Sequence, residues 1–111
     1  MNTTFDYFET VPFNVCVCDT EGIVLYQNRR SKEADGDVVG KSLFDCHNPH
    51  SSQMIKRMIE TGTGFTNEVI HHGQRRMYHR TPWYNDANEV AGLIELGLIL
   101  PMNVPVVNKD Q

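Results

Sequence analysis

DVVGKSLFDCHNPHSSQMIKRMIETG, residues 37–62, is the one strongly helical stretch in a sequence that otherwise favours strands. Asn48 is a good helix N-cap, and Pro49 suits the first helical position because no N–H is needed there. Gly62 is typical of the residue that ends a helix. Between them the apolar residues recur on one side and so predict an amphipathic helix: Met54, Ile55, Met58 and Ile59.

The segments on either side of this helix alternate between apolar and polar residues, which is typical of strands. A hairpin is expected around Gly22, and the five predicted strands are residues 14–19, 23–28, 65–71, 74–84 and 90–100. Short helical turns are expected at residues 4–10 and 29–37. This order predicts an α+β fold, in which a five-stranded antiparallel sheet packs its helices on one face and leaves an apolar space beneath the central helix.

The chain of 111 residues has the length of a single domain. We expect that domain to span residues 1–101, with residues 1–12 as an N-terminal cap segment and residues 102–111 as a C-terminal tail or linker. The net charge of -4 argues against nucleic-acid binding. No apolar run could span a membrane, no signal peptide is apparent, and the three cysteines lack metal or redox spacing, so a cytoplasmic protein is expected.

Three stretches of the sequence resemble a PAS domain. Residues 15–28 look like the opening hairpin of that family, including the asparagine that ends its second strand, and residues 39–41 (Val-Gly-Lys) look like the turn before its helical crossover. Residues 81–95 look like the closing hairpin, with Asn88 where a glycine is usual. The resemblance covers about residues 5–100. It implies the PAS fold and a sensory role, because PAS domains sense small molecules, redox state or light, and also dimerise.

Residues 39–49 further resemble a bacterial PAS subgroup that carries a Cys-His-x-Pro motif before the long helix, and some of its members are attached to hemerythrin-like domains. Cys46 and His47 could therefore ligate haem or form a redox-sensing site, or they could be structural. A metal site with His50 is not expected, since adjacent residues rarely point at one ion and no fourth ligand is evident. The cofactor stays unknown: haem fits the motif, whereas the flanking residues do not match a flavin motif.

We predict that a small apolar or aromatic ligand or cofactor binds between the sheet and the central helix. The candidate pocket residues come from the apolar face of the helix and from the two long strands: Cys46, His47, Met54, Ile55, Met58, Ile59, Met77, His79, Trp83, Ile94 and Leu96. Two alternatives stay open. One is a ligand-free protein-protein interaction module; the other is a small cavity enzyme, although no catalytic set is visible and Asp45, His47 and His79 are its only candidates.

An aromatic cluster near the N-terminus predicts a homodimer. The candidate interface joins this cluster to the sheet face expected to point outward, where Glu95 is also expected: Phe5, Phe8, Val11, Leu93 and Ile99. Alternatively, the N-terminal segment folds back over that face within one chain. Without an output domain, the chain is expected to act through an effector domain or a partner protein.

Overall fold

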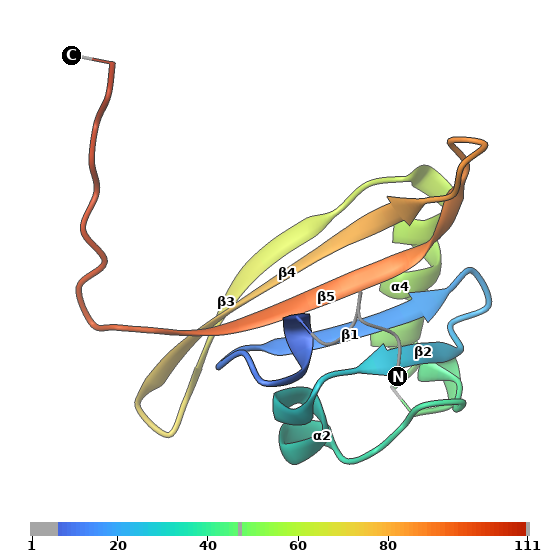
Figure 1. Ribbon diagram of the computed structural model, residues 1–111, viewed down its shortest axis with the longest axis horizontal. Coiled ribbons are helices and arrows are strands. Elements are labelled where there is room, and N and C mark those ends of the chain that lie inside the picture. The colour runs from blue at the N-terminus through green and yellow to red at the C-terminus, as the bar shows by residue number, and fades with distance from the viewer. Residues whose placement is uncertain (1–6, 47, 111) are drawn as a thin grey trace.

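The computed structural model describes residues 7–46 and 48–110, without the side chain of Cys46. Its five antiparallel strands lie in the order β2-β1-β5-β4-β3, and their bounds are β1 Asn14–Asp19, β2 Val24–Gln27, β3 Phe65–His71, β4 Gln74–Tyr84 and β5 Val90–Leu100. Three helices connect β2 to β3: α2 Arg29–Asp35, α3 Leu43–Cys46 and α4 Pro49–Thr61 (Figure 1). The predicted α+β fold is confirmed.

The central helix α4 begins and ends where its sequence signals lie. The Asn48 side chain accepts a hydrogen bond from the Ser51 amide at 2.8 Å. Gly62 takes a left-handed φ of 66°, and its N–H donates to the carbonyl of Met58 at 2.9 Å. Capping at both ends satisfies backbone groups that the helix itself leaves unpaired. Ile55 and Met58 are buried, so the apolar side of the helix faces the sheet.

Asn28 joins the opening hairpin, α2 and the N-terminal segment. Its side-chain oxygen accepts hydrogen bonds from the amides of Val15 and Ser31, both at 3.0 Å. Its side-chain nitrogen donates to the carbonyls of Phe8 at 2.9 Å and Phe13 at 2.8 Å. The side chain is fully buried with all four bonds made, so one residue fixes three segments.

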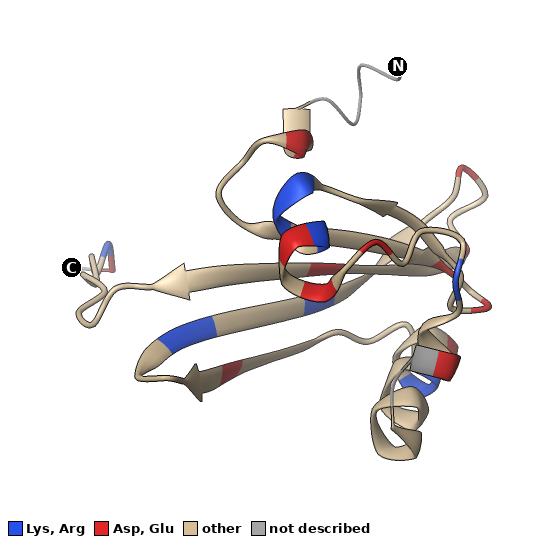
Figure 2. Cartoon of the chain, turned by 90° about the horizontal axis from the view of Figure 1, so that it is seen from below, with Lys and Arg blue, Asp and Glu red and all other residues tan. Residues whose placement is uncertain are grey.

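The sheet has two different faces. Figure 2 shows the α3–α4 segment on one side and the N-terminal helical turn, residues 7–9, on the other. We call the side toward α4 the cavity face and the opposite side the outer face. Strand alternation and the pairing of Cys16 with Glu95 place these side chains on the cavity face: Cys16, Cys18, Tyr78, Arg80, Leu93 and Glu95.

The faces of β5 are therefore the reverse of those expected from its sequence. Leu93 and Glu95 point toward the helices, while Ile94 and Leu96 point to the outer face. The expectation rested on the rule that a charged side chain avoids the interior. Glu95 is an exception because a cross-strand arginine, Arg80, pairs with it.

Gly92 allows a long-range contact between strands that are not neighbours. The Trp83 indole N–H on β4 donates to the carbonyl of Cys18 on β1 at 2.9 Å, although β5 lies between these strands. A Cβ at Gly92 would overlap that carbonyl oxygen and come within 2.6 Å of the indole nitrogen. Gly92 also has a φ of +154°, which side chains rarely adopt, so both the space and the backbone require glycine there.

Candidate functional site

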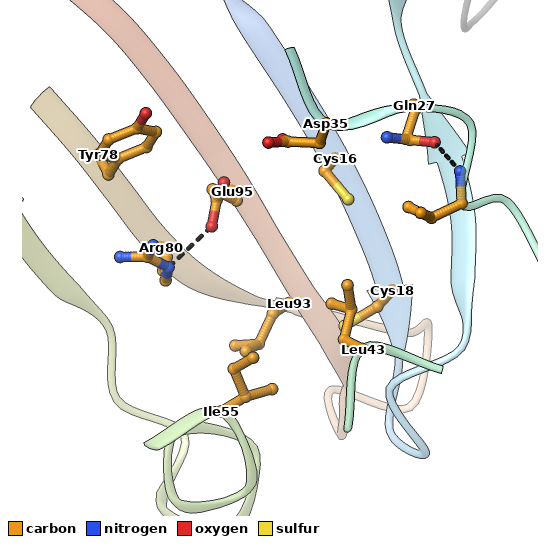
Figure 3. A pocket seen from close by; sticks show the side chains of 11 residues that line it. Cys16, Cys18, Gln27, Asp35, Leu43, Ile55, Tyr78, Arg80, Leu93 and Glu95 are labelled. Atoms are coloured by element: carbon orange, nitrogen blue, oxygen red, sulfur yellow. Dashed lines mark hydrogen bonds and ion pairs between the residues drawn. The ribbon is translucent and has the colours of Figure 1, made fainter. Parts of the chain in front are cut away.

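A cavity of about 390 Å³ lies between the cavity face of the sheet and the helical segments (Figure 3). Side chains from four strands and from the segment between β2 and β3 line it: Cys16, Cys18, Gln27, Asp35, Val38, Leu43, Ile55, Tyr78, Arg80, Leu93 and Glu95. Figure 3 shows that Leu43, Ile55 and Leu93 gather at one end and that the charged side chains lie toward the other. The cavity is thus amphipathic, where the sequence predicted an apolar space.

Arg80 and Glu95 form the polar centre of the cavity. They are direct neighbours across β4 and β5, and Arg80 Nε donates to Glu95 Oε2 at 2.8 Å. Arg80 Nη1 also donates to Asn67 Oδ1 at 3.3 Å, and the guanidinium lies 5.6 Å from the centre of the Tyr78 ring. The Arg80 and Glu95 side chains are 26% and 30% exposed, so the pair is accessible from the cavity while its geometry is held by its neighbours.

Gln27 forms a rigid part of the wall. Its side-chain amide donates to Ser31 Oγ at 3.1 Å and to the carbonyl of Gly36 at 3.0 Å, and its oxygen accepts from the amide of Val38 at 2.8 Å. These bonds leave it little capacity for a ligand. Asp35, at the end of α2, differs because it is exposed, and within the described residues no hydrogen bond or ion pair engages its carboxylate.

The two cysteines of β1 are uncharged thiols. Burial, followed by the charges of Glu95, Cys18 and Asp35, raises the pKa of Cys16 to about 12. Burial also raises the pKa of Cys18, against a smaller lowering by the hydrogen bond from the backbone of Leu93. Since the thiolate is the reactive form, neither residue is suited to nucleophilic or redox chemistry at neutral pH.

Of the pocket residues that the sequence suggested, Ile55 lines the cavity. Met58 and Ile59 belong to the adjacent core, with Met58 buried and Ile59 packed against it, and Met54 is half-buried on the same helix. The others that can be placed do not line the cavity, because strand alternation puts them on the outer face: Met77, His79, Trp83, Ile94 and Leu96.

The motif before α4 is described only in part, since Cys46 is the last residue of α3. The Cys46 side chain and the whole of His47 lie outside the described residues, so haem ligation or redox sensing there stays a prediction. The two other candidate acid–base residues lie away from the cavity lining: Asp45 is exposed on α3, and His79 Nδ1 lies 2.6 Å from Thr66 Oγ1 on the outer face.

None of the charged and polar residues that line the cavity was predicted from the sequence: Cys16, Cys18, Gln27, Asp35, Tyr78, Arg80 and Glu95. One signal was available. Glu95 is the single charge in the otherwise apolar β5, and a charge there requires exposure or a partner. Placing Arg80 opposite it required the strand register, which the sequence did not supply.

The residues suggested for a dimer interface separate in space. Leu93 is buried and lines the cavity, which corrects its assignment to an outward face. The assignment of Ile99 to the outer face was also wrong, because it alternates onto the same side of β5 as Leu93. Ile99 is 44% exposed and lines a second groove of about 320 Å³ near the end of β5. Phe8 is 43% exposed and Val11 is half-buried in the N-terminal segment, while Phe5 lies outside the described residues.

None of the helices in the described part of the chain has the length and apolar character needed to cross a membrane. In residues 7–46 and 48–110, no three His, Cys, Asp or Glu side chains come together in a way that could hold a metal ion.

A family model described as the PAS fold matches residues 8–98. No curated protein is similar enough to count as a match. Among solved structures, the chain is similar to the Vibrio cholerae VqmA dimer at 22% identity and a TM-score of 0.70, over 88% of this chain and 50% of VqmA. A structure of VqmA bound to DPO is similar at 23% identity and a TM-score of 0.69, over 87% and 56% of the two chains.

The PAS domain of histidine kinase ThkA is also similar, at 14% identity and a TM-score of 0.63, over 77% of this chain and 97% of that domain. At these identities the structural likeness concerns the fold. The chain spans about half the length of the VqmA chains it matches. Because the family model covers most of the sequence, this protein belongs to the PAS fold family.

Proposed function

We propose that this chain is a sensory domain that binds a small molecule in the cavity between its sheet and its helices. The cavity itself carries the proposal. Its volume of about 390 Å³ falls within the ~300–1,000 Å³ of typical ligand pockets. A ligand-free interaction module would instead fill this space with its own side chains. Similarity to VqmA, a protein of the same fold that has been solved with DPO bound, supports a small ligand.

The ligand we propose has a polar and an apolar part. Burying polar groups is unfavourable unless hydrogen bonds compensate, so charged side chains that face a cavity favour a ligand able to bond them. Arg80 has guanidinium donors beyond the two engaged by Glu95 and Asn67, and Glu95 has a second carboxylate oxygen. The proposal is one of binding and not of catalysis.

A fragment screen by ¹H–¹⁵N NMR tests this function. We expect a subset of small polar aromatic fragments to shift the amide signals of Tyr78, Arg80 and Leu93. Cys16→Phe should fill the cavity and abolish these shifts, whereas Cys16→Ser, which preserves the volume, should retain them. Circular dichroism establishes that both variants fold. If no fragment distinguishes the two variants, the cavity is not a binding site.

We also propose that the domain forms a homodimer through its outer face. Half-buried apolar side chains dominate this face, among them Val17, Met77, Ile94, Leu96 and Leu98. Within one chain its described cover is the N-terminal segment, which the Tyr26 hydroxyl holds through a 3.0 Å bond to Glu9. A second copy would bury more of this apolar surface. The effect of ligand binding would then be transmitted across the sheet to a partner or an effector domain.

The narrower subgroup with a Cys-His-x-Pro motif, and a haem or redox role for Cys46 and His47, stay predictions. An absorption spectrum of protein supplied with haem tests whether Cys46 or His47 ligates haem. A Soret band that shifts or disappears in Cys46→Ala or His47→Ala would support ligation at the motif. Absence of a band, or a band that neither change affects, would contradict it.

A further inference from the structure

The charges that line the cavity are unequal. Three lining residues are charged: the guanidinium of Arg80 and the carboxylates of Asp35 and Glu95. Arg80 and Glu95 form an ion pair at 2.8 Å and so compensate one another. Among the described residues no cation pairs with Asp35, which leaves the cavity with an excess of one negative charge.

The two carboxylates approach the same part of the cavity from different elements. Asp35 lies at the end of α2 and Glu95 in the middle of β5, and Figure 3 shows both projecting into the space beside Cys16. Both carboxylates line the same cavity as the Cys16 thiol, and, after burial, their charges contribute to its raised pKa. The thiol is itself neutral and does not compensate them.

From this arrangement, and resting on the proposed function, we infer that the cavity selects a cationic ligand. A protonated nitrogen, as in an aromatic amidine or amine, would lie between the carboxylates of Asp35 and Glu95. The apolar body of the ligand would lie against Leu43, Ile55 and Leu93. Hydrogen bonds between a charged N–H donor and a carboxylate are roughly twice as strong as neutral ones.

An anionic ligand fits the same cavity poorly. The one guanidinium already donates to Glu95 and Asn67, so an anion would compete with an existing ion pair and would also meet the carboxylate of Asp35. An anion would therefore bring like charges together, which is unfavourable, whereas a neutral ligand would leave the carboxylate of Asp35 without a charged partner.

Three probes of nearly the same shape test the inference: benzamidine is cationic, benzamide is neutral and benzoate is anionic. Their dissociation constants are measured at pH 7 by ¹H–¹⁵N NMR titration of the full chain. We expect benzamidine to bind at least tenfold more tightly than benzamide, and benzoate to bind most weakly. Asp35→Asn should weaken the binding of benzamidine until its dissociation constant is within threefold of that of benzamide. Glu33→Gln, an exposed acid on the same helix that does not line the cavity, is the matched control and should change neither.

The outcomes separate this inference from the proposed function. If the three probes bind equally and Cys16→Phe blocks all of them, the cavity binds ligands without charge selection, and only the inference is overturned. If none of the probes binds, or if binding is the same in Cys16→Phe, both are overturned. Selectivity that Asp35→Asn leaves intact also overturns the inference, because the second carboxylate would then have no part in recognition.

Discussion

Asn28 is the residue whose replacement we expect to destabilise the fold most, because Asn28→Ala removes four hydrogen bonds at once. The amides of Val15 and Ser31 would be left unpaired in buried positions, at a cost of about 1–3 kcal/mol each. The carbonyls of Phe8 and Phe13 are partly buried and add less, since water reaches them. We expect a loss of about 3–5 kcal/mol, which is a large part of the ~5–15 kcal/mol that stabilises a typical domain.

Asn28→Asp keeps the shape of the side chain but changes which hydrogen bonds it can make. The new carboxylate keeps the two acceptor bonds, but its second oxygen faces the carbonyls of Phe8 and Phe13. Burial then raises the pKa of the introduced carboxyl above its value of about 3.9 in the unfolded chain. Because the folded-state pKa is the higher one, the protonated form is favoured by folding and stability is lost as the pH rises. The variant should therefore be closer to the wild type at pH 4 than at pH 8.

Urea unfolding followed by circular dichroism measures both changes. The matched control is Asn85→Ala, because the Asn85 side chain also accepts two amide hydrogen bonds, from Ala87 and Glu89, but in an exposed turn. The reasoning fails if Asn28→Ala costs no more free energy of unfolding than Asn85→Ala. It also fails if the cost of Asn28→Asp is independent of pH.

Three further predictions concern the sheet, the thiols and the dimer. Gly92→Ala should lower the free energy of unfolding, measured in urea, by about 2–4 kcal/mol, because it strains the backbone and displaces the Trp83 indole. Gly36→Ala, at a positive φ in open space, should lower it by less. Equal losses in the two variants would contradict the argument. In a Cys46→Ser background, Cys16 and Cys18 of the folded protein should react with iodoacetamide at pH 8 at least ~100-fold more slowly than glutathione does, and urea unfolding should remove this difference. Rapid reaction of the folded protein would contradict the raised pKa values. Phe8→Asp should shift the molar mass measured by light scattering from dimer toward monomer, whereas Val106→Asp in the tail should not; an unchanged mass in both would remove Phe8 from the interface.

Much of the fold could be predicted because its signals are local. The cap and stop of α4 depend on Asn48, Pro49 and Gly62, whose conformational preferences act over one turn of helix. Strand alternation similarly predicted all five strands, with β2 shorter than expected. Ile23 instead forms a bridge with Ser42, and Asn28 turns away to cap α2. Asn88 takes the positive φ of 61° that its turn needs, as its place in the sequence indicated.

The site depended on tertiary structure. Alternation in β5 separates two sets of side chains but does not say which set faces the helices, and the more apolar set lies on the outer face. Strand register then determines which side chains of β4 and β5 lie opposite one another. A bulge between Trp83 and Tyr84 shifts the pairing by one residue, and this shift sets Arg80 opposite Glu95; continuing the pairing of Tyr84 with Val90 would set it opposite Ile94. The sequence by itself thus determined where the five strands and the helices α2 and α4 lie, because short-range preferences suffice for that. It did not predict the short helix α3. Only the packed sheet decided which charges share a cavity, because residues far apart in the chain meet there.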